Sequence, residues 1–373
     1  MVRSSFIRRP AHYGKDIAAC GVIGFINHDQ TRLDGSYIRR AMANMHDRGN
    51  GLGGGFAAYG IYPHRADLYA LHVMYDAKTD VPEVEKFLTS KLEVHKIEEI
   101  PVFEVPAIPS YPYFKRYFVL PPASRFPQVS DNDYMVSIVM HVNVNIEHAF
   151  VVSSGKNMGV FKGVGFPEDI ADFFRLDEYE GYTWTGHNRF PTNTPGWWGG
   201  AHPFALLDWS IVHNGEISSY GTNRRYLEMF GYQCTLQTDT EVVAYLMDLL
   251  VRRHELTFEQ AAAVFAPPFW KDIDRMDEPD KSLYSQLRMV YSAAALNGPF
   301  AFLMAWSDGL IGLNDRVKLR PLVVGTRGKT TYMSSEEAAI REICPDLERL
   351  WAPRAGRPVI ARLNEQPIAA SVE

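Results

Sequence analysis

A cysteine near the amino terminus is the residue whose position most suggests chemistry. Cys20 directly precedes the short apolar run 21–27, which is bounded by turn residues and predicts a buried strand. If the chain is cut before Cys20, this residue carries a thiol nucleophile and a free α-amine, whose usual pKa of about 8 suits a general base near neutral pH. The same nitrogen in a peptide bond is not basic. A packed core thiol is the alternative interpretation of a lone cysteine in a strand.

Three downstream motifs contain residue types that would complete an amide-hydrolysing site. Hydrolysis of an amide needs a nucleophile, a base and an oxyanion site, and an amino-acid substrate also needs groups that hold its α-carboxylate and its α-amine. Each motif also has a purely structural interpretation, as a surface arginine, an Asn-Gly turn or a helix-capping aspartate. The motifs are His187-Asn188-Arg189-Phe190-Pro191-Thr192, His213-Asn214-Gly215-Glu216 and Thr238-Asp239-Thr240-Glu241.

The hydrophobic pattern places these motifs at the ends of strands. The spacing of Thr238 and Glu241 is typical of a capping box that opens a helix. Strands interleaved with helices, without a strict βαβ rhythm, predict an α+β fold with two sheets and helices outside them. The strand-like ranges are 21–27, 183–189, 209–213, 300–306, 310–313 and 321–325, and the helix-like ranges are 33–45, 238–250 and 284–296.

The composition changes between residues 66 and 149, where we expect a small α+β insertion. The segment 134–145 reads as a strand, and 149–164 reads as a hairpin that follows the insertion. The glycine-rich segment 47–55 contains a G-x-G-x-x-G pattern, but it follows a helical pattern, so a flexible loop or a tight backbone approach is favoured over a dinucleotide fingerprint. The expected domains are a leader-like arm at 1–19, a catalytic domain at 20–65 and 150–373, and the insertion at 66–149.

Composition excludes several classes of partner. The formal net charge is -6 and charged residues make up 22% of the chain, so no basic surface for nucleic acid or anionic lipid is expected. No apolar stretch approaches the roughly 20 residues of a membrane helix, and the first 20 residues lack the apolar core of a signal peptide, which together predict a cytoplasmic protein. Without tight ligand pairs, His187, His202 and His213 are not expected to bind a metal.

The order of the motifs resembles that of a known family. The matching segments are Cys20-Gly21-Val22-Ile23-Gly24-Phe25, the three motifs above, Asn314-Asp315-Arg316, Arg320-Pro321-Leu322 and Ser334-Ser335-Glu336. On these residues the chain resembles a class II glutamine amidotransferase of the N-terminal nucleophile hydrolase fold, and most of all the amidotransferase portion of glutamate synthase large subunits. The resemblance implies a four-layer αββα sandwich.

The resemblance also implies a role for individual residues. Cys20 would be the nucleophile, with the Asn214 side chain and the Gly215 backbone N–H as oxyanion donors. Arg189 would bind the α-carboxylate of glutamine, Thr192 would line that pocket, and Asp239 would hold the α-ammonium group. The 19 residues before Cys20 depart from the mature family pattern, and the resemblance implies that they are removed as a propeptide.

We expect a glutaminase subunit that passes ammonia to a separate protein. The chain leaves no room for a flavin-binding synthase barrel, so a glutamate-synthase-like or N-methylglutamate-synthase-like partner is expected, in a hetero-oligomer. FMN and iron–sulfur clusters are expected only on that partner. One alternative is a non-catalytic glutamine-sensing or regulatory subunit that retains its leader. Another is an amidase for other acyl amides, which Arg189 and Asp239 disfavour because they suit both α-groups of glutamine.

Overall fold

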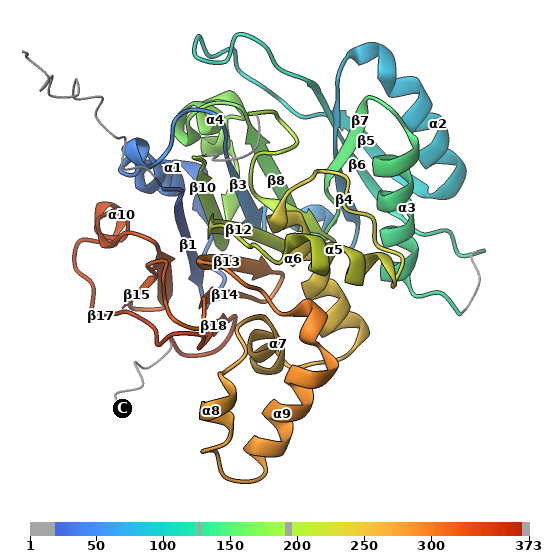
Figure 1. Cartoon of the computed structure of the whole chain (residues 1–373). Coiled ribbons are helices and arrows are strands. Elements are labelled where there is room, and N and C mark those ends of the chain that lie inside the picture. Colours follow the sequence, from blue (N-terminus) through green and yellow to red (C-terminus); the bar gives the residue numbers. More distant parts are fainter. Residues whose placement is uncertain (1–18, 125–127, 191–195, 368–373) are drawn as a thin grey trace, which may run out of the picture.

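The centre of the molecule is a pair of stacked antiparallel sheets. The computed structural model describes residues 19–124, 128–190 and 196–367. Within these residues, a seven-stranded sheet has the order β17-β15-β16-β1-β10-β3-β8 and a five-stranded sheet has the order β11-β12-β13-β14-β18 (Figure 1). The bounds of the first sheet are β1 Gly21–Asn27, β3 Gly54–Tyr59, β8 Met158–Gly163, β10 Thr183–Asn188, β15 Val323–Arg327, β16 Thr330–Ser334 and β17 Arg349–Trp351. Those of the second are β11 Phe204–Leu206, β12 Trp209–Gly215, β13 Phe300–Trp306, β14 Gly309–Asn314 and β18 Val359–Arg362.

The stacking follows from strands that are apolar on both faces. Successive side chains of a strand point to opposite faces of its sheet. In β1, Val22 and Ile26 therefore enter the core between the two sheets, where they pack in the same cluster as Leu303 of β13. The alternate residues Ile23 and Phe25 pack in a separate cluster on the helix-covered face. The continuous apolar run after Cys20 is thus a buried strand, as the sequence predicted, and it lies in the middle of its sheet.

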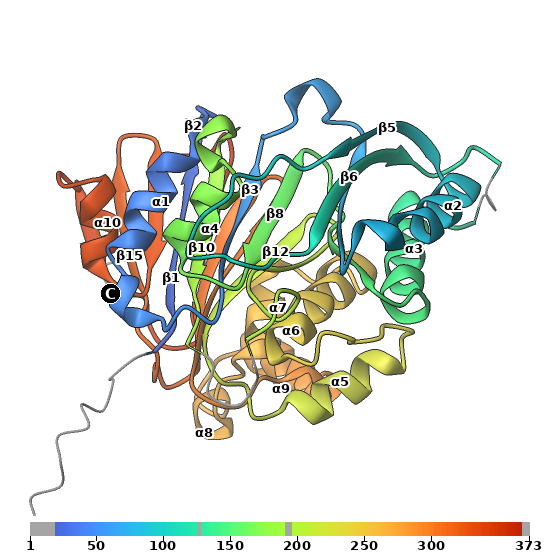
Figure 2. The same ribbon diagram turned by 90° about the horizontal axis from the view of Figure 1, so that it is seen from above.

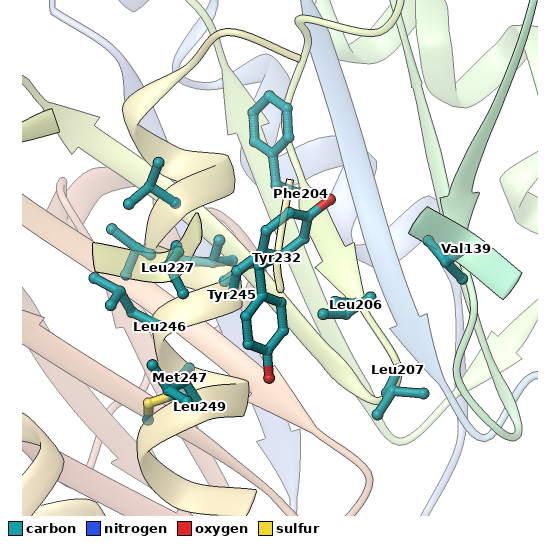
Figure 3. Packing of buried hydrophobic residues seen from close by; sticks show 14 of the residues in the cluster. Val139, Phe204, Leu206, Leu207, Leu227, Tyr232, Tyr245, Leu246, Met247 and Leu249 are labelled. Carbon is teal, nitrogen blue, oxygen red and sulfur yellow. The ribbon is translucent and has the colours of Figure 1, made fainter. Parts of the chain in front are cut away.

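Helices cover the outer face of each sheet. α1, α4 and α10 lie against the seven-stranded sheet, whereas α6 lies against β11 and β12 of the other sheet (Figure 2). Tyr245 and Leu246 of α6 belong to the same buried cluster as Phe204 and Leu206 of β11, and Figure 3 shows part of this cluster. This arrangement confirms the expected four-layer αββα sandwich. The helices are α1 Gly35–Ala43, α4 Pro167–Phe173, α5 Tyr220–Glu228, α6 Asp239–Met247, α7 Phe258–Phe265, α8 Trp270–Ile273, α9 Asp280–Val290 and α10 Glu337–Ile343.

A third sheet, with the order β5-β6-β4-β7, lies to one side of the sandwich together with α2 and α3 (Figure 1). The expected strand at 134–145 is wrong, because α3 spans Asp131–Asn145. Its buried residues Met135, Ile138, Val139 and Val142 recur at helical spacing, and the Ser130 side chain caps its first turn by accepting from the Asp133 N–H. The other bounds are β4 Tyr69–Tyr75, α2 Val81–Lys91, β5 Glu93–Glu99, β6 Tyr113–Leu120 and β7 Ala149–Ser153.

The expected hairpin at 149–164 is also wrong. β7 pairs with β4 of the third sheet, whereas β8 pairs with β3 of the seven-stranded sheet. The chain crosses from one sheet to the other between β7 and β8, so these two strands follow each other in the sequence but belong to different sheets. The insertion boundaries at 66 and 149 stay a prediction. A two-stranded ribbon of β2 Leu33–Asp34 and β9 Glu180–Gly181 completes the fold. Among the described residues, no helix has both the length and the apolarity to cross a bilayer.

Candidate active site

Cys20 and Arg189 lie at the same end of neighbouring strands. Gly21 of β1 is paired with Asn188 of β10, so the residue before one strand lies beside the residue after the other. The backbone N–H of Phe190 donates to the Cys20 sulfur at 3.3 Å. The strand register, which the apolar run after Cys20 helps to set, therefore brings the thiol to one end of the central strands of the seven-stranded sheet, next to a guanidinium.

The thiol at this end of the strands is partly buried. Burial raises the pKa of Cys20, and this effect is opposed by the Phe190 N–H and by the positive charges of Arg189 and Arg320. In the sequence, Arg320 belongs to the distal segment Arg320-Pro321-Leu322, for which no place in the site was predicted. Its influence on both Cys20 and His213 shows that the segment after β14 comes close to the thiol. With its nitrogen in a peptide bond, Cys20 lacks a base of its own and stays a thiol near neutral pH.

Arg189 is held in place by the glycine-rich loop before β3. Its backbone N–H donates to the carbonyl of Gly53 at 2.9 Å, and its side chain is 5% exposed. A Cβ on Gly53 would lie 2.9 Å from the Arg189 Cδ, and Gly53 has φ of +153°. The lack of a side chain at Gly53 therefore lets the loop backbone lie close to Arg189, which is the tight backbone approach expected for this segment. Burial lowers the pKa of Arg189, and nearby Cys20 and Asp239 oppose that effect, which places the guanidinium near both groups.

Asn214 and Gly215 end β12 on the facing sheet. Asn214 is paired with Ala301, which is paired in turn with Asn314, so these three residues share one face. Ala301 belongs to the core between the sheets, and this face therefore points toward the seven-stranded sheet. Gly215 has φ of +136°, and a Cβ there would lie 2.0 Å from the Pro299 carbonyl oxygen, so only glycine fits.

The side chain of Asn214 has an unusual environment. It is fully buried, and neither its Oδ1 nor its Nδ2 has a hydrogen-bond partner. Asn314, at the matching position of β14, has the same two unpartnered atoms. Buried amide groups are paired in the large majority of cases, because an unmade hydrogen bond costs about 1–3 kcal/mol. Two such amides in one row indicate groups reserved for a ligand or for water. In the sequence, Asn314 belongs to a segment that matches the family, but that match predicted no role for it.

Asp239 occupies the first turn of α6, against the segment that follows Gly215. Its Oδ2 accepts from the Ile217 N–H at 2.9 Å, and its Oδ1 accepts from the Thr240 hydroxyl at 3.1 Å. Thr238 caps the helix by accepting from the Thr240 N–H. The expected reciprocal capping box is not formed, because Glu241 instead accepts from the backbone N–H groups of Thr235 and Leu236.

A buried polar cluster lies beneath these residues and links the two sheets. His187 of β10 shares a 3.0 Å hydrogen bond with the His213 carbonyl of β12, and its ring stacks on His202 at 3.9 Å. The Thr240 hydroxyl contacts ring nitrogens of both His202 and His213. Burial lowers the pKa of all three histidines, to about 3 for His187. The neutral rings act as packing and hydrogen-bonding groups, and no group of three or more metal-ligating side chains is gathered anywhere in the described ranges.

Lys162 of β8 is a further buried charge that the sequence did not single out. It is 3% exposed, and its Nζ donates to the Gly199 carbonyl at 3.0 Å and lies 4.2 Å from the centre of the Phe204 ring. Burial lowers the pKa of Lys162 to about 7, although the carboxylate of Glu241 opposes the effect. Burial likewise raises the pKa of Glu241 to about 7. No pattern in a single strand distinguishes such a lysine from an exposed one.

The structure thus gathers Cys20, Arg189, Asn214, Gly215 and Asp239 at one end of the sandwich. Thr192 and residues 1–18 lie outside the described residues. The assembled groups comprise a nucleophile, a cation, a carboxylate and an unpartnered amide. Together they could hold a zwitterionic amino acid and stabilise negative charge on a carbonyl oxygen.

Several known proteins are similar to this chain over most of its length. Residues 104–347 match the family model of the class II glutamine amidotransferases. An uncharacterized protein of Archaeoglobus fulgidus is 55% identical over 359 residues, which are 94% of this chain and 94% of that protein. A protein of Methanothermobacter thermautotrophicus, provisionally named a glutamine amidotransferase, is 24% identical over 87% of this chain and 93% of its own length.

Among solved structures, the glutamine phosphoribosylpyrophosphate amidotransferase of B. subtilis is similar to this chain. The match has 16% identity and a TM-score of 0.43, and it covers 92% of this chain. This chain spans 49% of the length of that enzyme. The family assignment rests on the model match, which extends over well more than half of the chain and includes the segments of Arg189, Asn214 and Asp239. The chain belongs to the class II glutamine amidotransferases.

Proposed function

We propose that this protein hydrolyses the side-chain amide of glutamine to glutamate and ammonia, with Cys20 as the nucleophile after its α-amine has been freed. The observation that carries the proposal is the fully buried Asn214 amide, which has no partner and ends a strand on the sheet that faces Cys20. A donor kept unpaired in this position suits an oxyanion that exists only during the reaction. Family membership supports glutamine as the source of the amide.

The chemistry proceeds through a thioester. The free α-amine of Cys20 takes the thiol proton, and the sulfur attacks the side-chain carbonyl carbon of glutamine. The oxyanion of the tetrahedral intermediate accepts from the Asn214 Nδ2 and the Gly215 N–H, each of which contributes about 3 kcal/mol to the transition state. The C–N bond then breaks, and the α-ammonium returns its proton to the leaving ammonia. Water attacks the thioester by the same route, releasing glutamate and the thiol.

Two charged groups would select a free amino acid. Arg189 pairs with the α-carboxylate, for which its two parallel N–H donors are suited, and Asp239 accepts from the α-ammonium group. Asp239 is already oriented by the Ile217 N–H, so that its position does not depend on the substrate. Thr192 is proposed to line the same pocket. An acyl amide without α-groups would offer neither residue a group of opposite charge, which disfavours a general amidase.

We further propose that the ammonia passes to a separate flavin-dependent synthase in a cytoplasmic hetero-oligomer. The resemblance of the motifs to the amidotransferase portion of glutamate synthase supports a glutamate-synthase-like or N-methylglutamate-synthase-like partner. On this proposal FMN and iron–sulfur clusters belong to the partner, and this chain supplies only the hydrolytic half-reaction.

One observation favours a second state of the same protein. In the full-length chain the α-nitrogen of Cys20 is part of a peptide bond, and burial raises the pKa of the thiol. Both effects hold the nucleophile in its inactive, protonated form. A chain that keeps residues 1–19 would therefore be dormant, or would act as a glutamine-sensing subunit.

The test combines intact mass and amino-terminal sequencing with an assay of glutamate release. We expect a mature terminus at Cys20 in active preparations, and loss of glutamate release in the Cys20→Ala variant. Glutamine turnover by a chain that retains residues 1–19, or turnover that survives Cys20→Ala, would refute the proposed mechanism. Glutamine binding by an intact chain without turnover would favour the sensing state instead.

A further inference from the structure

A cavity between α9 and the loop after β14 contains two arginines without a counter-charge. It has a volume of about 300 Å³ and is lined by Trp270, Arg288, Tyr291, Asn297 and Arg316 among others. In the described part of the chain, neither guanidinium forms an ion pair with a carboxylate. The cavity lies beside α8 and α9, at the opposite end of the molecule from α2 (Figure 1).

Neutral groups hold both guanidinium groups at the cavity. Arg288 donates to the Pro268 carbonyl and stacks over Trp270, with its Cζ 4.5 Å from the ring centre. Arg316 donates to the Asn297 Oδ1 at 3.2 Å, and its Cζ lies 4.9 Å from the centre of the Phe269 ring. Carbonyls and rings orient the two side chains without neutralising them. Burial and the charge of Arg316 both lower the pKa of Arg288, which agrees with the two like charges being close.

Two fixed guanidinium groups that face one cavity are suited to an anion. Arginine recognises carboxylate and phosphate oxygens through pairs of parallel N–H donors, and such charge-assisted hydrogen bonds are about twice as strong as neutral ones. Arg316 also borders a second cavity of about 440 Å³, whose wall includes Glu259 and Asp272, but neither carboxylate pairs with it. We propose that the cavity between Arg288 and Arg316 binds a small phosphate- or carboxylate-bearing molecule.

The volume and lining limit the size of this ligand. About 300 Å³ is at the lower end of the range for small-molecule sites. Ser292 and Asn297 add uncharged hydrogen-bonding groups, whereas Val264 and Leu287 add apolar surface. A compact organic anion therefore fits better than a nucleotide or a polymer.

The same cavity is connected to the proposed oxyanion site through one short loop. Asn297, which receives the hydrogen bond from Arg316, accepts from the Ser218 N–H at 2.8 Å through its carbonyl. Two residues later, the Pro299 carbonyl accepts from the Glu216 N–H at 2.9 Å. The segment that contains Gly215 is therefore held by the loop that Arg316 contacts. A bound anion would compete with Asn297 for the Arg316 guanidinium, so this part of the inference, which rests on the proposed function, makes the site a regulator of glutamine hydrolysis.

Binding is tested first, because it does not depend on activity. Isothermal titration of the full-length protein with inorganic phosphate, pyrophosphate and citrate distinguishes phosphate from carboxylate ligands. We expect saturable binding of at least one of them, weakened about 10- to 100-fold by Arg288→Gln or Arg316→Gln, as expected for the loss of a charged hydrogen bond. Arg275→Gln removes the same charge from a nearby exposed arginine that does not line the cavity, and it should leave affinity within about twofold.

The possible results distinguish a failure of the anion-binding proposal from a failure of the proposed glutaminase function. No saturable binding of any of the three anions, or equal binding by wild type and Arg316→Gln, overturns the proposal. Arg288→Lys, which keeps the charge but loses the planar fork, serves as a second variant if Arg288→Gln does not fold, and it too should bind more weakly. In preparations that release glutamate, the bound anion should change the KM or kcat for glutamine by about 5-fold or more, as expected for an allosteric coupling. An anion that binds without any such change refutes the regulatory role alone, and a protein without glutaminase activity still leaves the binding result decisive.

Discussion

Replacement of Asn214 by leucine should change stability and activity in opposite directions. Leucine has the same branching as asparagine but no polar atoms. The buried Asn214 amide has no hydrogen-bond partner at either atom, so the folded state carries a desolvation cost of about 1–3 kcal/mol for this group. Leucine removes that cost, although its larger volume adds some packing strain. We expect the free energy of unfolding to rise by about 1–2 kcal/mol.

The same substitution should nearly abolish glutamine hydrolysis. Loss of one oxyanion donor lowers kcat about 10²- to 10³-fold in enzymes that stabilise a tetrahedral intermediate. The change should fall on kcat rather than on KM, because the donor acts on charge that develops only in the transition state. Urea unfolding measures the first effect and glutamate release measures the second, with a chain that begins at Cys20 used for the kinetics.

Asn223 supplies a matched control for the stability measurement. It is as fully buried as Asn214, but its Nδ2 donates to the carbonyls of Ala293 and Ala295, and its Oδ1 accepts from the Ser219 hydroxyl. Asn223→Leu leaves these partners unsatisfied and should lower the free energy of unfolding by about 2–4 kcal/mol. If Asn214→Leu is destabilised to the same degree and still releases glutamate at the wild-type rate, the amide is structural and the reasoning is refuted.

Three further substitutions test charge, geometry and recognition at the site. Burial lowers the pKa of Lys162 to about 7 from its usual 10.5, so between these pH values the unfolded chain binds more protons than the folded chain. The free energy of unfolding of the wild type should therefore rise by about 1.4 kcal/mol per pH unit from pH 7.5 to 9.5. Lys162→Met should lose that slope in urea titrations, the exposed Lys86→Met should keep it, and a slope unchanged in Lys162→Met would contradict the buried charge. Gly215→Ala should lower the free energy of unfolding by more than 3 kcal/mol, because the new methyl group would meet the Pro299 carbonyl. Gly231→Ala, at a position with positive φ but open space, should lower it by only about 1 kcal/mol. Equal losses in the two variants would argue against the contact with Pro299. Arg189→Lys should raise the KM for glutamine about 10- to 100-fold in initial-rate assays, since the paired donors are lost, and an unchanged KM would show that Arg189 does not bind the α-carboxylate.

The local hydrophobic pattern was sufficient to predict those elements whose structural partners are near in the sequence. The strands β13 and β14 pair through the turn at Ser307 and Asp308, as their spacing indicated. The helix after Thr238 begins where its capping residue predicted. The strand prediction for residues 134–145 was wrong. The valines and the isoleucine of this segment favour a strand by propensity, but burial of one helical face against the third sheet stabilises a helix instead.

The sequence by itself indicated the candidate site residues and the order of the family motifs, because a thiol before an apolar strand and the motifs around Arg189, Asn214 and Asp239 are local features. It could not reveal which buried polar groups lack partners. That property depends on the register of β12, β13 and β14, which aligns Asn214 with Asn314, and on strands β1 and β10, which bring Cys20 beside Arg189. The uncompensated charges of Arg288 and Arg316 likewise arise only where α9 meets the loop after β14. Hydrogen bonding and charge compensation are properties of neighbours in space, so the tertiary structure alone decided them.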